Sequence, residues 1–490
     1  MPAVTQMAER PRASQHRFET RQLHAGRMPD ILNSCATPIY NTAAFGFNDS
    51  QHGTRLLEFQ ELGPIYSRIG NPTVSVLENR IAAMEGGVAA VAVASGTAAV
   101  TMTLMALAAV GDNIVSASSV HGGTYHLFKA LGPQIGIECR FISDTNPASF
   151  EAKIDSKTKF IFVETVSNPK YEVPDMSPLA KIAHDHGIPF IVDNTFGCGG
   201  FVGRPIDHGA DVVLHSATKW IGGHGTTLGG LIVDAGTFDW GKNRDRFPQF
   251  HADASAEGSG ELSLWESFGR RAFAVRVQFE ILRDVGSCLS ATAAQQLLIG
   301  IESLALRCER HSANTEALAA WLKEQPNVTW VSYLGDPEHP SHANARKYLR
   351  SGFGSMLSFG VRGGRDAGFA FCDSLDFITT CTNLGDSKTL VVHPWTTTHQ
   401  QLTDAERWAA GVTEDHIRVS VGIEHIDDLK AEIAYALEQS QKRTAGDTAS
   451  SDAVKKSHVA AAQAMMITAL YGEGPKVIAK GNAVPATGPL

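Results

Sequence analysis

The stretch "IPFIVDNTFGCGGFVGRPIDHGADVVLHSATK", residues 188–219, decides the fold. It contains two short apolar runs, "IPFIV" and "ADVVL", and polar residues follow each run directly. Strands inside a parallel sheet have continuous apolar sequences of this kind, because both of their faces are covered. Ligands of open α/β sheets bind beyond the carboxyl ends of the strands. We therefore expect two buried strands that bring Asp193 and Lys219 to one site.

The same alternation of strand-like and helical segments extends from residue 71 to about residue 270. Further strand-like runs are "AAVAVA", "NIVSA" and "KFIFVET", and "SPLAKIAHDHG" is a helix between two strands. The helix "NPTVSVLENRIAAMEGG" has Asn71 as its N-cap, Pro72 at its first position and Gly86 at its end. Four strands end in polar turns, "SGT", "ETVSNP", "DNT" and "HSATK". The pattern predicts an α/β fold with a mostly parallel central sheet flanked by helices.

The chain divides into four segments by sequence pattern. Residues 1–70 lack periodicity and are predicted to form an extended N-terminal arm. Residues 71–288 hold the α/β domain. Residues 289–440 combine one long helical stretch with the strands "MLSFGV", "TLVVH" and "HIRVSVG" and the helix "DDLKAEIAYALEQS", which predicts a smaller C-terminal α+β domain. Residues 441–490 are predicted to be a linker and tail.

Composition and charge argue against several classes of protein. The 490 residues include 42 Lys and Arg against 51 Asp and Glu, and a net charge of −9 disfavours nucleic acid as a partner. Seven scattered cysteines and no secretory signal indicate reduced thiols and a cytoplasmic protein. The uncharged residues 88–110 are better explained by a strand, a turn and a helix than by a membrane span. The His and Cys spacings support no metal site.

Lys219 lies between a hydroxyl cluster and five glycines in "HSATKWIGGHGTTLGG". A lysine at a buried strand end can lose its charge and attack a carbonyl, although a lysine in a surface loop is the alternative. Asp193 needs a cationic partner, which a protonated pyridine nitrogen would supply, but it could also cap a turn or pair with an arginine. Together, a lysine and an aspartate of this kind are what a protein offers pyridoxal 5′-phosphate.

A phosphate site is predicted where the "SGT" turn meets a helix N-terminus, because free backbone N–H groups and the helix dipole favour an anion there. Hydroxyl groups would complete it, and the candidates are Ser95, Gly96, Thr97, Ser216 and Thr218. A plain strand-to-helix turn is the alternative.

Arg418, in "IRVSVGIE", lies on the strand face opposite Ile417 and Val419. It would bind a substrate carboxylate if that face lines a cleft, and would have no special role if it faces water.

These residues belong to long motifs that resemble the Cys/Met-metabolism family of pyridoxal-phosphate enzymes over roughly residues 18–438. The motifs include "YSRIGNPTVSVLE", "VASGTAA", "ETVSNP", "VDNTF" and "RPIDHGADVVLHSATKWIGGHGTTLGG". The resemblance implies the fold-type-I transferase fold. The form "NLGDSKTL" favours the O-acetylhomoserine sulfhydrylase branch. That branch converts O-acetylhomoserine and sulfide to homocysteine and acetate by γ-replacement. O-Acetylserine is a second candidate substrate.

The resemblance also implies residue roles. Lys219 would be the Schiff-base lysine and proton shuttle, and Asp193 the partner of the ring nitrogen. The remaining cofactor ligands would be Ser95, Gly96, Thr97, His121, Asn168, Ser216 and Thr218. The substrate would meet Arg418, Asn383 and Tyr66, and the catalytic groups would be Lys219, Tyr66 and His121. Tyr66 and Arg68 would reach the cofactor phosphate of a neighbouring subunit, which implies a homotetramer built from dimers with shared active sites.

The chain departs from the family pattern at three places. His121, before "GGTY", stands where the family has a tyrosine that stacks on the cofactor ring. The loop "DNTFGCGGFVGRP" replaces a "DNTFATP" type of continuation, and "EGSGEL" at 257–262 stands where sulfhydrylases commonly have a Tyr-His-Gly element. A cystathionine γ-synthase or γ-lyase is the alternative within this chemistry. A catalytically impaired relative with a structural or regulatory role is the alternative from another class.

Overall fold

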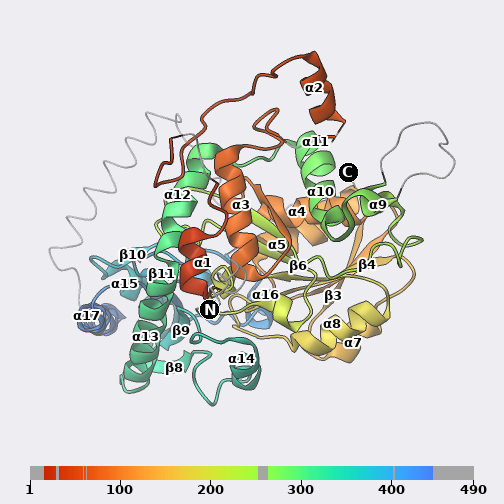
Figure 1. Ribbon diagram of the computed structural model, residues 1–490. Helices are drawn as coiled ribbons and strands as arrows, with labels where there is room; N and C mark the ends of the chain where they lie inside the picture. Colours follow the sequence, from red (N-terminus) through yellow and green to blue (C-terminus); the bar gives the residue numbers. More distant parts are fainter. Residues whose placement is uncertain are drawn as a thin grey trace, which may run out of the picture.

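Two β-sheets organise the chain in the computed structural model, which describes residues 16–28, 32–58, 60–61, 63–251, 263–400 and 403–444 (Figure 1). The strands of the large sheet are β1 (Ala89–Val93), β2 (Asn113–Ala117), β3 (Glu138–Ile142), β4 (Thr158–Glu164), β5 (Phe190–Asp193), β6 (Val212–Ser216) and β7 (Gly230–Asp234). Within the described ranges their order is β1-β7-β6-β5-β4-β2-β3. Strand β7 pairs antiparallel with β1 and β6, and the other pairs are parallel. The prediction of a mostly parallel sheet is confirmed, although β3 and β7 were not among the predicted strands.

Both faces of the large sheet are buried, because successive residues of a strand point to opposite sides. In β5, Phe190 and Val192 belong to one apolar core, and Ile191 between them belongs to a second core on the other face. The main covering helices are α3 (Pro72–Glu85), α4 (Gly96–Leu107), α8 (Met176–Asp185) and α12 (Ala291–Glu302). Helix α13 (Leu304–Lys323) begins against the core of the large domain and continues onto the smaller sheet. Shorter helices are α5 (Gly122–His126), α6 (Gly132–Gln134), α7 (Pro147–Glu151), α9 (Leu264–Phe268), α10 (Ala272–Arg276) and α11 (Arg283–Val285).

Local signals explain where the main helices begin and end. The Asn71 side chain accepts a hydrogen bond from Thr73 N, and Gly86 ends α3 with a φ of 85°, as the sequence predicts. The long helical stretch predicted near residue 300 consists of two helices, α12 and α13, separated at Ser303. The Arg307 guanidinium donates to the Gly300 carbonyl beside this break, at 2.7 Å, and so satisfies a carbonyl of the last turn of α12.

The smaller sheet has the order β10-β11-β12-β9-β8 in the described part of the chain. Its strands are β8 (Val328–Ser332), β9 (Met356–Val361), β10 (Thr379–Thr380), β11 (Leu390–Val392) and β12 (His416–Ser420), and its helices are α14 (His342–Tyr348), α15 (Gly364–Asp373), α16 (Asp404–Ala409) and α17 (Ile426–Thr444). Helices α15 and α17 pack on each other over a separate apolar core. This arrangement is the predicted α+β domain. Helix α17 includes residues 441–444, which the sequence pattern places in the linker.

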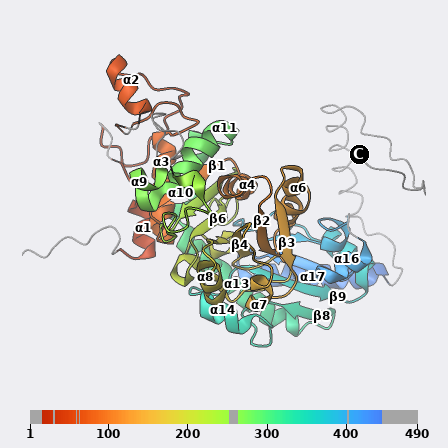
Figure 2. The same cartoon turned by 90° about the vertical axis from the view of Figure 1, so that its right-hand side faces the viewer.

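The N-terminal arm, which was predicted to be extended, contains two helices, α1 (Phe18–His24) and α2 (Ser50–Leu57). Helix α1 lies against α3, α12 and α13, and the Gln22 side chain binds the Glu302 carbonyl and the Ala305 N–H. Its stability therefore comes from packing rather than from its own periodicity. Helix α2 lies at the outer end of a loop that extends away from the sheets (Figures 1 and 2). The described ranges contain no helix with the length and apolar character to cross a bilayer, and residues 88–110 form β1 and α4.

Candidate active site

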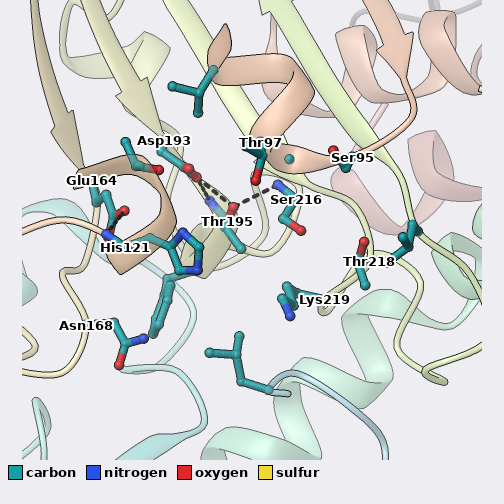
Figure 3. A pocket seen from close by; sticks show the side chains of 16 residues that line it. Ser95, Thr97, His121, Glu164, Asn168, Asp193, Thr195, Ser216, Thr218 and Lys219 are labelled. Atoms are coloured by element: carbon teal, nitrogen blue, oxygen red, sulfur yellow. Dashed lines mark hydrogen bonds between the residues drawn. The ribbon is translucent and has the colours of Figure 1, made fainter. Parts of the chain in front are cut away.

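A cavity of about 210 Å³ lies at the carboxyl ends of the large sheet (Figure 3). Its walls come from the turns that follow β1, β4, β5 and β6, because the carboxyl ends of parallel strands meet at one edge. The cavity brings together these predicted residues: Ser95, Gly96, Thr97, His121, Asn168, Asp193, Ser216, Thr218 and Lys219. The four polar turns singled out in the sequence therefore converge on one space.

One end of the cavity presents hydrogen-bond donors from the start of helix α4. The Ser95 hydroxyl accepts from Ala98 N at 3.1 Å and caps the helix, while the N–H groups of Gly96 and Thr97 have no partner in the described part of the chain. A Cβ on Gly96 would lie 2.6 Å from the Cβ of Ser216, so only glycine lets the two turns approach this closely. Free helix amides beside hydroxyl groups suit a phosphate.

Asp193 has one oxygen fixed by its own turn. Thr195 donates to Asp193 Oδ1 through its N–H at 2.9 Å and its hydroxyl at 2.6 Å, and Ser216 N donates to the Thr195 hydroxyl at 2.8 Å (Figure 3). The carboxylate thus does cap a turn, as one interpretation of the sequence had it. No arginine or lysine of the described ranges lies within ion-pair distance of it, so Oδ2 can serve a cation in the cavity.

Lys219 is a cavity residue rather than a surface lysine. Its Nζ donates to Asn383 Oδ1 at 2.6 Å, which joins the large domain to the smaller one at this point. Burial lowers the pKa of the Lys219 ammonium, and the nearby Arg418 charge lowers it further. A larger fraction of the amine is therefore neutral and nucleophilic than in a solvated lysine.

His121 extends into the same cavity from the loop after β2 (Figure 3). Its backbone N–H donates to Glu164 Oε1 at 2.6 Å. Burial lowers the pKa of the imidazole, Asp193 partly offsets this effect, and Lys219 and Arg418 lower the pKa again. The lowered pKa favours the neutral ring, which can accept a proton at one nitrogen.

Two further predicted residues, Asn168 and Arg418, have buried polar groups without the partners that such groups usually have. Asn168 has its Oδ1 buried without a hydrogen-bond partner in the described chain, although it lines the cavity. Arg418, on β12, is only 6% exposed, and its Nη2 donates to the carbonyls of Thr382 and Asn383 at 3.1 and 3.4 Å. No carboxylate of the described chain lies within ion-pair distance of Arg418. A buried cation without an acidic partner is prepared for a carboxylate ligand.

The predicted residues Asn383 and Arg418 are not among those that line the cavity, although Asn383 contacts Lys219. Tyr66 and Arg68 are not brought to this cavity either. Tyr66 is 42% exposed, the Arg68 guanidinium lies 5.5 Å from the centre of its ring, and Arg68 also donates to the Arg283 carbonyl. Neither residue lines the site of its own chain. The segment "EGSGEL" at 257–262 lies outside the described residues.

The cavity also includes Glu164, Thr195 and Phe196, to which the sequence interpretation gave no role. Glu164 ends an apolar strand just as Asp193 does, so the same signal was present in "ETVSNP". Burial raises the pKa of the Glu164 carboxyl well above its ordinary value, and the Asp193 charge raises it further. Thr195 could have been inferred from "DNT", because a Thr two residues after an Asp commonly completes a side-chain turn.

Behind the cavity lies a buried polar cluster that no sequence pattern predicted. Glu85 of α3 binds His215 Nε2 at 2.7 Å and Asn194 Nδ2 at 2.8 Å through its Oε1, and Asn194 Oδ1 accepts from the Thr165 hydroxyl at 2.6 Å. The cluster ties helix α3 to the ends of β4, β5 and β6. Gly197 packs directly against this cluster, because a Cβ on Gly197 would lie 1.9 Å from Asn194 Oδ1.

Replacing Gly197 with alanine is therefore expected to lower the free energy of unfolding by about 1–3 kcal/mol, since the extra methyl group overpacks a buried polar cluster. Thermal denaturation of the purified variant measures this effect. Gly46→Ala is the matched control, because a Cβ on Gly46 meets no atom within 4 Å. Equal melting temperatures for Gly197→Ala and the parent protein would contradict the tight packing of Asn194.

The fold and the site define a pyridoxal-phosphate-dependent enzyme of fold type I. A cavity lysine, an oriented aspartate, unpaired helix amides with hydroxyls and an unpaired buried asparagine oxygen fit that cofactor. Residues 19–438 match the sequence model of the Cys/Met metabolism PLP-dependent enzymes, and the chain belongs to this family.

Several relatives support the assignment. The chain is 60% identical to a sulfhydrylase-like protein of Epichloe uncinata over 86% of this chain and 88% of that protein. It is 52% identical to the homocysteine synthase of Schizosaccharomyces pombe over 87% and 99% of the two chains. A putative O-acetylhomoserine (thiol)-lyase from Campylobacter jejuni, solved with N′-pyridoxyl-lysine-5′-monophosphate, superimposes with a TM-score of 0.82 at 37% identity, covering 86% and 100% of the two chains.

Proposed function

We propose that this enzyme is an O-acetylhomoserine sulfhydrylase, which converts O-acetylhomoserine and sulfide to homocysteine and acetate. The observation that carries the proposal is the Lys219 amine, which burial brings toward neutrality in a cavity shared with Asp193 and the start of α4. The homocysteine synthases among its relatives point to this substrate class. Pyridoxal 5′-phosphate, when bound, draws electrons from the amino acid and so weakens its C–H bonds.

The residues of the chain divide the remaining work. Arg418 binds the substrate carboxylate with the guanidinium nitrogens that the Thr382 and Asn383 carbonyls leave free. Lys219 Nζ removes the proton from the substrate α-carbon, and the Asn383 side chain holds this amine in place. A proton then leaves Cβ, and this lets acetate depart from Cγ with the electrons of the C–O bond. The sulfur of sulfide forms the new bond to Cγ, one proton returns to Cβ, and Lys219 gives the other back to Cα. Neutral His121 accepts the proton that hydrogen sulfide gives up.

A substrate panel tests this function. Purified enzyme whose visible cofactor band disappears on borohydride reduction is offered O-acetylhomoserine or O-acetylserine with sulfide or cysteine. We expect homocysteine from the first ester and sulfide at the highest kcat/KM. Cystathionine from cysteine would instead assign a γ-synthase, and 2-oxobutyrate released without a sulfur donor would assign a γ-lyase. No turnover in a protein that retains the band would favour a non-catalytic role.

We further propose that the active sites are shared between subunits of a homotetramer built from dimers, with Tyr66 and Arg68 completing the site of a neighbour. The exposure of Tyr66 and its absence from the cavity of its own chain support this arrangement.

A cytoplasmic location also remains our proposal, supported by seven cysteines that are all free thiols in the structure.

Shared sites predict complementation between two inactive variants. We expect Lys219→Ala and Arg68→Ala, refolded together in equal amounts, to regain about a quarter of the parent activity. About half of the dimers would then be mixed, and one of the two sites in each mixed dimer has both native residues. The activity of the mixture after co-refolding, compared with each variant refolded alone, is the measurement. A mixture no more active than the average of its components would contradict shared sites.

A further inference from the structure

Glu164 is a buried carboxyl at the cavity that the proposed reaction leaves without a role. It is the last residue of β4, and in the parallel pairing of β4 with β5 it stands directly beside Asp193 (Figure 3). Paired residues of neighbouring strands point to the same face, so two carboxyl groups occupy adjacent positions at the floor of the cavity. Ionising both carboxyl groups would place two negative charges close together where little water screens them, and this costs free energy.

The contacts of the two carboxyl groups differ in kind. Asp193 accepts two hydrogen bonds from Thr195 and has its other oxygen free for a cation. Glu164 instead accepts the backbone N–H of His121 at 2.6 Å, and the rest of the described chain supplies no cation within ion-pair distance. The titratable groups around Glu164 are Asp193, His121 and, in the small cavity on its other side, Asp144 and Glu172. Most of its surroundings thus favour the neutral acid.

We propose that Glu164 is a positioning residue that keeps its proton during the reaction, anchors the turn carrying His121 to the end of β4, and leaves Asp193 as the charged member of the pair. The anchor acts on the His121 backbone, which immediately precedes helix α5, so it fixes where the imidazole enters the cavity. The electrostatic part follows from the same geometry, because a protonated Glu164 does not compete with Asp193 for the cationic ring nitrogen of the cofactor. This inference rests on the proposed function for the role of His121.

Two substitutions separate the anchor from the charge. Glu164→Gln keeps a neutral side chain with an acceptor oxygen for His121 N–H, and Glu164→Leu removes the acceptor at similar size. We expect Glu164→Gln to keep kcat within about 3-fold of the parent, and to keep both limbs of the pH profile of kcat/KM, because no ionisation is lost. Glu164→Leu should lower kcat about 10- to 100-fold through misplacement of His121, with a smaller effect on KM. Glu172→Leu is the matched control beside the same strand end and should change little.

Two further measurements, circular dichroism without substrate and a double variant with His121→Ala, test the role of Glu164 separately from the proposed reaction. The visible circular dichroism of the cofactor band, without substrate, should be unchanged in Glu164→Gln and altered in Glu164→Leu, even if the proposed reaction is wrong. In a His121→Ala background, Glu164→Leu should add almost no further loss of kcat, because the anchor acts through His121. Additive losses in that double variant, or a Glu164→Gln protein as impaired as Glu164→Leu, would overturn the proposal. A Glu164→Leu protein with the parent's kcat and circular dichroism would do the same.

Discussion

Replacing Lys219 with alanine is expected to lower kcat at least about 10⁴-fold, because the substitution removes the nucleophilic amine and the proton acceptor together. Arginine at the same position should be equally inactive, although it keeps a positive charge, since its guanidinium stays protonated in proteins. Burial and the Arg418 charge lower the pKa of Lys219 in the native chain, and this effect has no counterpart in arginine. The measurement is homocysteine formation in the presence of excess cofactor.

Borohydride labelling provides the second readout for this position. Reduction should fix the cofactor to the parent chain and to the control Lys181→Ala, whose lysine is exposed and pairs with Asp185. It should leave Lys219→Ala unlabelled. Stable labelling of Lys219→Ala, or activity above about one per cent of the parent, would show that another amine performs the chemistry.

Replacing Asp193 with asparagine is expected to lower kcat about 10²- to 10³-fold, because a preorganised charge at the reacting centre is lost while the shape is kept. The amide oxygen can still accept both hydrogen bonds from Thr195, so the turn should remain intact. The same substitution should lower the pKa of His121 further, since Asp193 is the group that raises it. Steady-state kinetics over a range of pH measures both effects.

The matched control for this charge is Asp239→Asn, at an exposed turn where Asp239 Oδ1 accepts from Lys242 N. It should retain the parent kcat and cofactor affinity. If Asp193→Asn were also within about 3-fold of the parent, the carboxylate would serve only as a turn cap, and the cofactor would need another partner for its ring nitrogen.

The sequence was most informative where one element by itself carries the signal. Asp193 and Lys219 could be placed because each directly follows a continuous apolar strand, and such strands pair in parallel with their carboxyl ends at one edge. The end of helix α3 was equally readable from its cap and its glycine. Helix α1 was missed because a short helix that depends on packing has no strong local pattern. Helix α2 was missed although it has a local signal, since the Asp49 side chain caps its start by accepting from His52 N at 2.6 Å.

Residues that come from separate elements and act on one another could not be placed in this way. The motif "ETVSNP" places Glu164 at a strand end, but it does not indicate that Asp193 stands beside Glu164 in the sheet or that the His121 N–H donates to it. The Glu85 cluster behind the cavity was equally invisible, because its members come from a helix and from three separate strand ends.

The sequence by itself determined that the sheet is mostly parallel, that four of its strands end in polar turns, and which residue types suited to a pyridoxal-phosphate site stand there, because hydrophobic periodicity and turn chemistry are local properties of a chain. Only the tertiary structure decided that Asn383 holds the Lys219 amine, that Arg418 is buried without a carboxylate partner, and that Glu164 carries a raised pKa. These properties depend on which side chains meet and on how much water their meeting excludes, and packing alone sets both.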